Sequence, residues 1–307
     1  MNRIPVILDV DTGLDDALAL LLVSDLAQLQ LMGIACVNGN ASVEDTYRNT
    51  RYIAKLLNIK VPVSKGAANP MINKVLHAKE AHGSFGLGNL KVEMEAEKHI
   101  LPASQMYIKL LTETTEPITI IATGPLTNLA HLIINHPELK PKIKLISFMG
   151  GSTTQGNVTP YAEFNAHADP EALSVVLKSG IALMMAGLNI TNDLRIKADP
   201  VTKVVKDPTD TQKIFIDFID FYANSAFYRH EDRGAALHDS TAVAAVAFPE
   251  AFEKGMKSII VDVSKDVRRG ETREEGDSNN VLVLTSVDLK FMVNLTVVSI
   301  HHLRRTE

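Results

Sequence analysis

The chain has 307 residues, of which 46% are hydrophobic and 22% are charged, and its formal net charge at pH 7 is -5. This is the balance of a globular protein, and the negative charge argues against nucleic acid or an anionic membrane as the main partner. No apolar run is long enough to span a bilayer and no signal peptide precedes the first strand pattern, so we expect no membrane partner. The one cysteine, Cys36, excludes an internal disulfide and suits a reducing cytoplasm, which is the expected location.

Strand and helix patterns alternate along the first part of the chain. Apolar, mostly branched residues at positions 4–10 predict a buried strand. Residues 66–100 break the alternation, with several glycines and little periodicity. Between these two segments the pattern predicts a helix at 18–29, a strand at 31–37, a helix at 42–57 and a strand at 61–64.

The alternation returns after residue 100, apart from a second irregular stretch at 150–168. Strands that alternate with helices imply parallel pairing through right-handed crossovers. We therefore predict an α/β fold, an open, mostly parallel twisted sheet flanked by helices, in one domain over residues 1–307. The later elements are predicted as helices at 103–112, after the turn at 123–126, from 170 and at 288–303, and strands at 118–122, 143–149, 182–186, 259–263 and 281–284.

The most informative segment has the sequence DVDTGLDDA and spans residues 9–17. Its four aspartates stand where the first strand ends and the next helix begins, and in open α/β sheets this edge is where ligands bind. A capped helix start needs one or two acids, and four repel one another unless a cation or a shared proton relieves them. A bound metal is the simplest relief.

Other polar residues follow later strands and should meet the aspartates on the same rim, at the carboxyl ends of the strands. Taken alone, Asn40 and the turn at Thr123 would be ordinary connection residues. Oxygen ligands suit calcium or magnesium better than zinc. A carboxylate beside metal-bound water can act as a general base, and a histidine as a general acid. The rim therefore predicts metal-assisted hydrolysis at a sugar carbon, with these residues gathered there: Asp9, Asp11, Asp15, Asp16, Asn40, Asn157, Glu163, Asn165, His238 and Asp239.

Six segments in order resemble the inosine–uridine-preferring nucleoside hydrolases, calcium-dependent N-ribohydrolases with an open α/β fold. Any one short segment would be weak evidence, whereas six in order, over nearly the whole chain, are specific. The match loosens near residues 268–274, where it concerns oligomer contacts more than chemistry. The matching segments are DVDTGLDDA (9–17), NGN (38–40), TGPLTN (123–128), MGG (149–151), NVTPYAEFN (157–165) and HD (238–239).

The resemblance implies hydrolysis of ribonucleosides to ribose and free base. It implies that Asp11 also deprotonates the attacking water and that His238 protonates or polarises the departing base. Asp9 would have a supporting role. A homotetramer or homodimer is the family expectation. In the implied site, Ca²⁺ is held by Asp11, Asp16, Asp239 and the carbonyl of Thr123, and the substrate by Asp15, Asn40, Asn157, Glu163, Asn165 and His82.

Two alternatives stay open at this point. A haloacid-dehalogenase-like phosphatase also has an Asp-x-Asp pair after a strand, but it wants Thr or Val where Gly13 stands. A non-catalytic nucleoside- or sugar-binding protein could use the same pocket. Nor does the sequence decide which bases are accepted. Also undecided are the roles of His82, Tyr222, Tyr228 and Arg229 and the effect of Phe85, which replaces an expected acidic residue, on loop closure.

Overall fold

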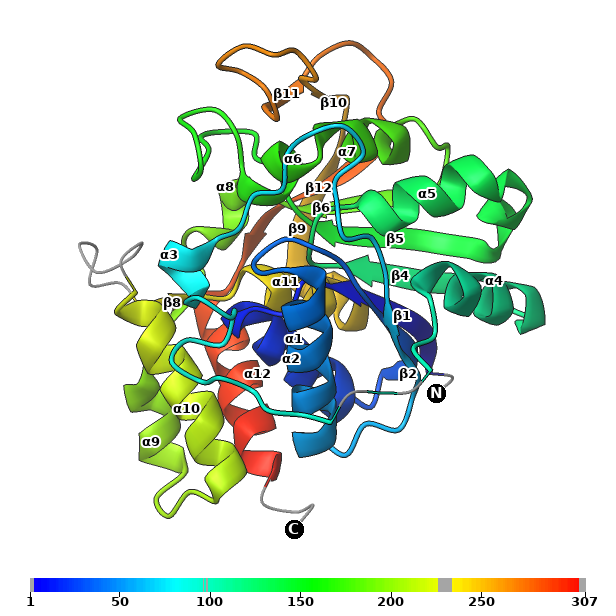
Figure 1. Ribbon diagram of the computed structural model, residues 1–307. Coiled ribbons are helices and arrows are strands. Elements are labelled where there is room, and N and C mark those ends of the chain that lie inside the picture. The colour runs from blue at the N-terminus through cyan, green and yellow to red at the C-terminus, as the bar shows by residue number, and fades with distance from the viewer. Residues whose placement is uncertain (1–2, 96, 98, 226–233, 304–307) are drawn as a thin grey trace.

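The computed structural model describes residues 3–95, 97, 99–225 and 234–303 (Figure 1). Its centre is an eight-stranded sheet in the order β3-β2-β1-β4-β5-β6-β12-β9. Neighbouring strands are parallel except for β12 and β9, which confirms the predicted fold class. The strands are β1 (Ile4–Val10), β2 (Leu29–Cys36), β3 (Val63–Lys65), β4 (Ile118–Ala122), β5 (Ile143–Met149), β6 (Leu183–Ala186), β9 (Phe252–Lys257) and β12 (Val281–Val287).

Helices cover both faces of the sheet, so side chains that alternate along a strand enter two different cores. Val6 and Leu8 of β1 pack into one core, whereas Ile7 between them packs into the other. The first face is covered by α1 (Leu14–Asp25), α2 (Val43–Leu56), α10 (Asp210–Ala223), α11 (His238–Ala247) and α12 (Leu289–His302). The second face is covered by α4 (Ala103–Glu113), α5 (Thr127–Asn135) and α7 (Pro170–Leu177).

The first helix begins four residues earlier than the apolar pattern predicts. Gly13 is its N-cap, and the polar side chains of Asp15 and Asp16 belong to its first turn. These two acids belong to the crevice described below rather than to the apolar core. The apolar periodicity that predicts a helix therefore begins only after them. The helix also ends early because Leu26 has extended backbone geometry, and β2 therefore begins at Leu29.

Several short elements escaped the sequence pattern. The antiparallel edge strand β9 is mostly polar and half exposed, so it lacks the apolar run that marks the buried strands. In the described ranges no helix combines the length and the apolar character needed to cross a membrane. The strand predicted at 259–263 is present as β10 (Ile259–Val261), outside the central sheet. The other elements that the pattern did not indicate are α3 (Lys79–His82), α6 (Phe164–Ala168), α8 (Leu188–Thr191), α9 (Ala198–Val204), β7 (Arg195–Ile196), β8 (Ala235–Ala236), β11 (Thr272–Glu274) and the 3₁₀ turns Pro137–Lys142 and Pro249–Ala251.

Candidate functional site

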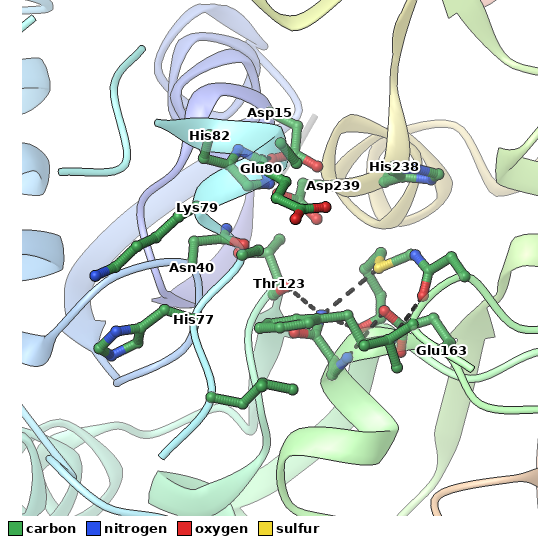
Figure 2. Close-up of a pocket in the computed structure, with 18 of the residues that line it drawn as sticks. Asp15, Asn40, His77, Lys79, Glu80, His82, Thr123, Glu163, His238 and Asp239 are labelled. Carbon is green, nitrogen blue, oxygen red and sulfur yellow. Dashed lines mark hydrogen bonds and ion pairs between the residues drawn. The ribbon is translucent and has the colours of Figure 1, made fainter. Parts of the chain in front are cut away.

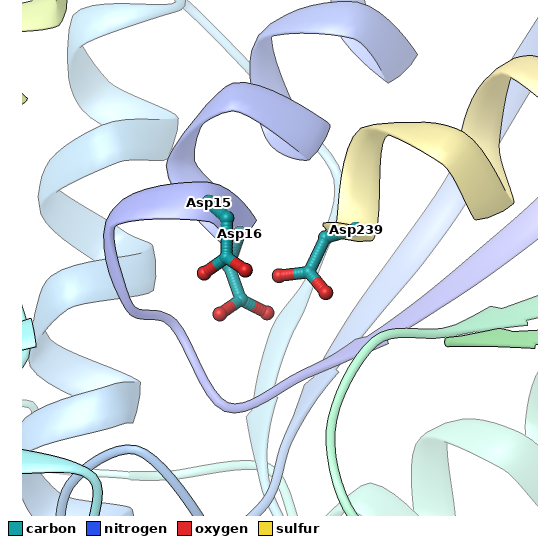
Figure 3. A group of neighbouring side chains, drawn as sticks. All are labelled: Asp15, Asp16 and Asp239. Atoms are coloured by element: carbon teal, nitrogen blue, oxygen red, sulfur yellow. The ribbon is translucent and has the colours of Figure 1, made fainter. Parts of the chain in front are cut away.

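The strand order changes direction between β1 and β4, since β2 and β3 extend the sheet on one side and β5 and β6 on the other. At such a switch point the loops that follow the two strands separate and leave a crevice. The loop after β1 brings Asp11 to this crevice, and the loop after β4 brings Thr123, whose N–H donates to the carbonyl of Asp9 at 2.8 Å. The helix starts of α1 and α11 reach the same place (Figure 3).

A cluster of buried carboxylates lies at this crevice. Asp15, Asp16 and Asp239 each offer one oxygen, and these three oxygens lie within 4.8 Å of one another (Figure 3). In the described part of the chain, no such three-ligand group includes Asp11. Asp11 is nevertheless 1% exposed, and its Oδ1 has no hydrogen-bond partner, which is also true of Asp15 Oδ1. A buried carboxylate oxygen without a hydrogen-bond partner is costly, and two such oxygens in one cluster fit a site that would hold a cation.

Burial and mutual repulsion raise the pKa values of the clustered aspartates. Burial, and after it repulsion from Asp16, raises the pKa of Asp15 to about 8 and that of Asp11 well above its usual range. Burial raises the pKa of Asp16, and burial together with Asp15 raises that of Asp239. The ionised cluster is therefore strained by itself, and a divalent cation would relieve it.

Two glycines let the backbone close around the Asp11 carboxylate. A Cβ on Gly39 would lie 2.0 Å from Asp11 Oδ2, and a Cβ on Gly124 would lie 2.8 Å from Asp11 Oδ1. The backbone N–H of Asn40 donates to Oδ2 at 2.7 Å. These contacts fix the carboxylate from one side while Oδ1 stays unpaired.

Asp16 is held by three donors from three different segments. The N–H of Gly13 and the side-chain amide of Asn40 donate to Oδ2 at 2.8 and 3.1 Å, and the Thr123 hydroxyl donates to Oδ1 at 2.7 Å. The Thr123 carbonyl, the expected metal ligand, accepts a hydrogen bond from Asn165 Nδ2 at 2.7 Å. Asn165 therefore touches the place where a cation would sit.

Asp9 lies one layer behind the cluster. Its carboxylate accepts hydrogen bonds from the Tyr107 hydroxyl at 2.6 Å and from Asn128 Nδ2 at 3.0 Å. Burial raises its pKa to about 7, although both hydrogen bonds act in the opposite direction. Asp9 therefore contacts the supporting network rather than the crevice.

A cavity of about 570 Å³ opens in front of the carboxylates (Figure 2). This volume lies in the range of pockets that enclose small organic ligands. Asp11 and Asp16 lie behind the lining, so Asp15 and Asp239 are the carboxylates of the cluster that a ligand would meet first. The polar lining residues are Asp15, Asn40, His77, Lys79, Glu80, His82, Thr123, Asn157, Glu163, Asn165, Tyr222, His238 and Asp239.

The loop after β5 supplies the opposite wall of the cavity. Glu163 caps α6: its carboxylate accepts from the N–H groups of Asn165 at 2.9 Å, Gly151 at 2.8 Å and Ala166 at 3.1 Å. Burial raises the pKa of Glu163 to about 7 in spite of these donors. Asn157 Oδ1 accepts from the N–H of Phe164 at 2.9 Å. A wall of carboxylate and amide groups suits a ligand with several hydroxyls.

Three histidines line the cavity, His77, His82 and His238, and burial lowers the pKa of each, which favours the neutral imidazole. The two that lie closest to the carboxylate cluster in sequence or in the fold are His82 and His238. His82 Nδ1 accepts from the N–H of Leu14 at 3.2 Å, which leaves the ring proton on Nε2. His238 Nδ1 lies 2.7 Å from the Thr191 hydroxyl. Burial lowers the pKa of His82 and of His238 to about 3, with Arg195 contributing for His238. Neutral imidazoles can donate from one nitrogen while the other accepts.

The structure brings every predicted catalytic, metal-binding and substrate-binding residue to this crevice, either on the cavity wall or directly behind it. Sequence patterns missed Thr191, because its link to His238 spans 47 positions and leaves no local signal. They also left the role of Tyr222 undecided. Its ring lies 5.0 Å from that of His82, and its hydroxyl lies 3.4 Å from Asp15 Oδ2.

Three further candidates do not line the cavity or cannot be placed. Tyr228 and Arg229 fall outside the described residues. Phe85 is 39% exposed and does not line the cavity, while its carbonyl accepts from Asn49 Nδ2 at 2.7 Å. Its position therefore links it to the turn after α3 rather than to the ligand.

Comparisons with known proteins agree on one family. The family model of the inosine-uridine preferring nucleoside hydrolases matches residues 6–294. The pyrimidine-specific ribonucleoside hydrolase RihA of Salmonella typhimurium is 34% identical over 305 residues, covering 95% of this chain and 96% of that protein. RihA of Photobacterium profundum is 37% identical over 258 residues, covering 82% of each chain.

A solved structure is similar over the same length. The purine-preferring ribonucleoside hydrolase from Gardnerella vaginalis superposes with a TM-score of 0.89 at 27% identity, covering 99% of this chain and 100% of that one. The base preferences in these names differ, so the likeness does not assign a base.

The close approach of Gly39 to Asp11 is open to test. Gly39→Ala places a methyl group 2.0 Å from Asp11 Oδ2, so the carboxylate must move, and we expect calcium affinity to fall at least about tenfold by titration calorimetry. Gly255→Ala in β9 is the matched control, because nothing lies within 4 Å of its Cβ position. Wild-type affinity in Gly39→Ala would show that this contact does not fix Asp11 for the metal.

Proposed function

Because the chain belongs to the inosine–uridine-preferring nucleoside hydrolase family, we propose how its own residues carry out the reaction of that family. The protein is a hydrolase that acts on N-glycosyl compounds. Its reaction is the hydrolysis of the N-glycosidic bond of ribonucleosides to free ribose and nucleobase. The observation that carries the assignment is the buried aspartate cluster beneath a cavity whose opposite wall is built from amide and carboxylate groups.

The donors at the crevice fit calcium. They are oxygens only, and two buried carboxylate oxygens, on Asp11 and Asp15, have no partner. Asp11, Asp16 and Asp239, with the Thr123 carbonyl, would hold the ion. When bound, calcium neutralises these carboxylates, keeps them ionised and lowers the pKa of a neighbouring water. Asp15 lines the cavity and is assigned to the substrate instead.

Asp11 is the general base in this proposal. Its Oδ2 is fixed by the N–H of Asn40, whereas Oδ1 is unpaired and free to accept a proton from the attacking water. The backbone at Gly39 and at Gly124 packs closely against the carboxylate, which leaves it little room to rotate. A fixed base of this kind lowers the entropic part of the barrier.

The ribose lies between the cluster and the opposite wall. Asp15 faces the sugar from the side of α1. Glu163, Asn157 and Asn165 face it from the loop after β5. Carboxylates and amides on both sides accept and donate hydrogen bonds to vicinal hydroxyls. The residues assigned to the substrate are Asp15, Asn40, His82, Asn157, Glu163 and Asn165.

His238 stabilises the departing base. Burial lowers the pKa of His238 to about 3, which favours the neutral form. We assign its ring proton to Nε2, with Nδ1 accepting from the Thr191 hydroxyl that lies 2.7 Å away. From Nε2 it can donate to a ring nitrogen or carbonyl of the base as negative charge develops there. His82, whose ring lies 5.0 Å from that of Tyr222, is assigned to contact with the base.

Wider properties extend the same proposal. We infer one domain over residues 1–307, because strands from both ends of the chain, β1 and β12, belong to one sheet. We also propose a cytoplasmic location and a homodimer or homotetramer, which the family resemblance implies. The haloacid-dehalogenase-like alternative is not favoured, since the family match runs through nearly the whole chain.

The activity is tested with a reducing-sugar assay on inosine, uridine, cytidine, adenosine and a deoxy analogue, in the presence of calcium. We expect ribose release from at least one ribonucleoside and a loss of about 10²–10⁴-fold in kcat for Asp11→Asn. Substrate binding without release by the wild type would favour the non-catalytic alternative. Phosphate release from phosphate esters would favour the phosphatase.

Removal of the metal should lower activity and thermal stability together. A ligand that binds the folded state alone stabilises it by about 2.7 kcal/mol at a concentration of 100 Kd, so EDTA should lower Tm by several degrees. Calcium should restore Tm better than magnesium at equal concentration. Asp16→Asn should lose this shift, whereas Asp217→Asn, on the exposed side of α10, should keep it. An EDTA-insensitive Tm would contradict a resident cation.

The role of His238 predicts a dependence on the leaving group. His238→Ala should lower kcat for natural nucleosides by about 10²–10⁴-fold, because their bases leave poorly without a hydrogen bond. A p-nitrophenyl riboside, whose leaving group is stable as an anion, should lose less than about tenfold. His136→Ala removes a partly exposed histidine and serves as the control. Equal losses on both substrates would exclude the acid role.

A further inference from the structure

A hairpin outside the catalytic site packs against the loop that carries Glu163. It consists of β10, β11 and the turn between them, residues 259–274, and is called the brace hairpin below. It lies beside α6 and α7 (Figure 1). Within the hairpin the N–H of Asp262 donates to the Glu271 carbonyl and the N–H of Gly270 to the Asp262 carbonyl, each at 2.8 Å.

Thr272 joins the brace hairpin to the loop after β5. Its hydroxyl accepts from the N–H of Ser152 and donates to the Ser152 carbonyl, both at 2.7 Å. Thr272 is 4% and Ser152 is 2% exposed, so water cannot readily replace either bond. One side chain therefore satisfies both backbone groups of Ser152.

The residue before Ser152 contacts Glu163 directly. The N–H of Gly151 donates to Glu163 Oε2 at 2.8 Å. Gly151 has φ +69, and a Cβ on it would lie 2.8 Å from Thr272 Oγ1. The hydroxyl that holds Ser152 thus also limits where the Gly151 N–H can point.

The other side of the same loop is held as well. Ala162, next to Glu163 in sequence, forms an antiparallel bridge with Glu271. The hairpin therefore contacts the loop near both of its ends: Thr272 contacts residues 151–152, and Glu271 pairs with Ala162. Glu163 directly follows Ala162 in sequence, and its carboxylate accepts from the N–H of Gly151 at the other contact.

The turn of the brace hairpin is anchored to α7. Arg269 forms a two-pronged ion pair with Glu171 at 2.6 and 2.7 Å, and both side chains are largely buried. The Arg269 carbonyl is 2.9 Å from His167 Nδ1. Gly270 packs so closely that a Cβ would lie 2.5 Å from His167 Cα. An anchored hairpin can transmit its position to the loop.

We propose that Thr272 is a positioning residue for ribose recognition. Through its two hydrogen bonds with Ser152 it sets the direction of the Gly151 N–H, and this N–H orients the Glu163 carboxylate toward the sugar. Thr272 does not line the cavity, so its effect is transmitted by the loop. The role in recognition rests on the proposed function of Glu163, whereas the bracing of the loop does not.

The test compares Thr272→Val, which keeps the shape and removes the hydroxyl, with Thr272→Ser, which keeps the hydroxyl. Thr296→Val in α12 is the matched control, because Thr296 is also buried and its hydroxyl donates to the Met292 carbonyl at 3.0 Å. We expect Thr272→Val to lower kcat/KM for the best ribonucleoside about tenfold. Thr272→Ser should stay within about threefold of the wild type, and Thr296→Val should leave kcat/KM unchanged.

A double-mutant cycle with Glu163→Gln locates the effect. If Thr272 acts through Glu163, Thr272→Val should change kcat/KM less than about twofold in the Glu163→Gln background. A full tenfold loss in that background would overturn the proposal. Equal losses of kcat/KM in Thr272→Val and Thr296→Val would also overturn it, since they would reflect stability alone.

Hydrogen exchange separates this proposal from the catalytic one. Amides of residues 150–166 should exchange faster in Thr272→Val than in Thr296→Val, whether or not the protein cleaves nucleosides. Unchanged exchange in this segment would exclude the brace. Faster exchange with no ribose release by the wild type would instead leave the brace standing and overturn the role in recognition together with the proposed function.

Discussion

The rest of the site depends on four aspartates that are buried together where the strand order reverses, namely Asp11, Asp15, Asp16 and Asp239. Like charges at this range and this depth repel, and burial adds the cost of removing each carboxylate from water. The surrounding structure offsets part of this cost with directed donors. Asp16 alone receives three of them, from the start of α1, the loop after β2 and the loop after β4.

These donors leave two carboxylate oxygens of the cluster without a hydrogen bond. Asp11 Oδ1 and Asp15 Oδ1 are buried without partners, while the other oxygens of these two groups have contacts at 2.7 and 3.4 Å. A protein that needed only stability would have no reason to keep such atoms. A cation and a polyhydroxy substrate would supply partners for these two oxygens.

The cavity wall opposite the aspartate cluster is stabilised in a different way. Glu163 is a carboxylate at a helix start, and three backbone N–H groups hold it in place. The loop that carries it is contacted by a hairpin about a hundred residues later in the chain, in a region where the resemblance to the family loosens. A segment that looks unrelated to the chemistry by sequence therefore contacts and supports the loop that carries Glu163.

The sequence by itself determined the fold class, most of the strands and the set of residues on the rim, because these depend on local periodicity and on the rule that parallel strands end at one edge. It placed the start of α1 too late, since Asp15 and Asp16 interrupt the apolar period for the sake of the site. Only the tertiary structure decided which oxygens stay unpaired, that Thr191 contacts His238 and that Thr272 supports Ser152. Those contacts join positions 47 and 120 residues apart, and no local pattern records a distance that exists only after the sheet has formed.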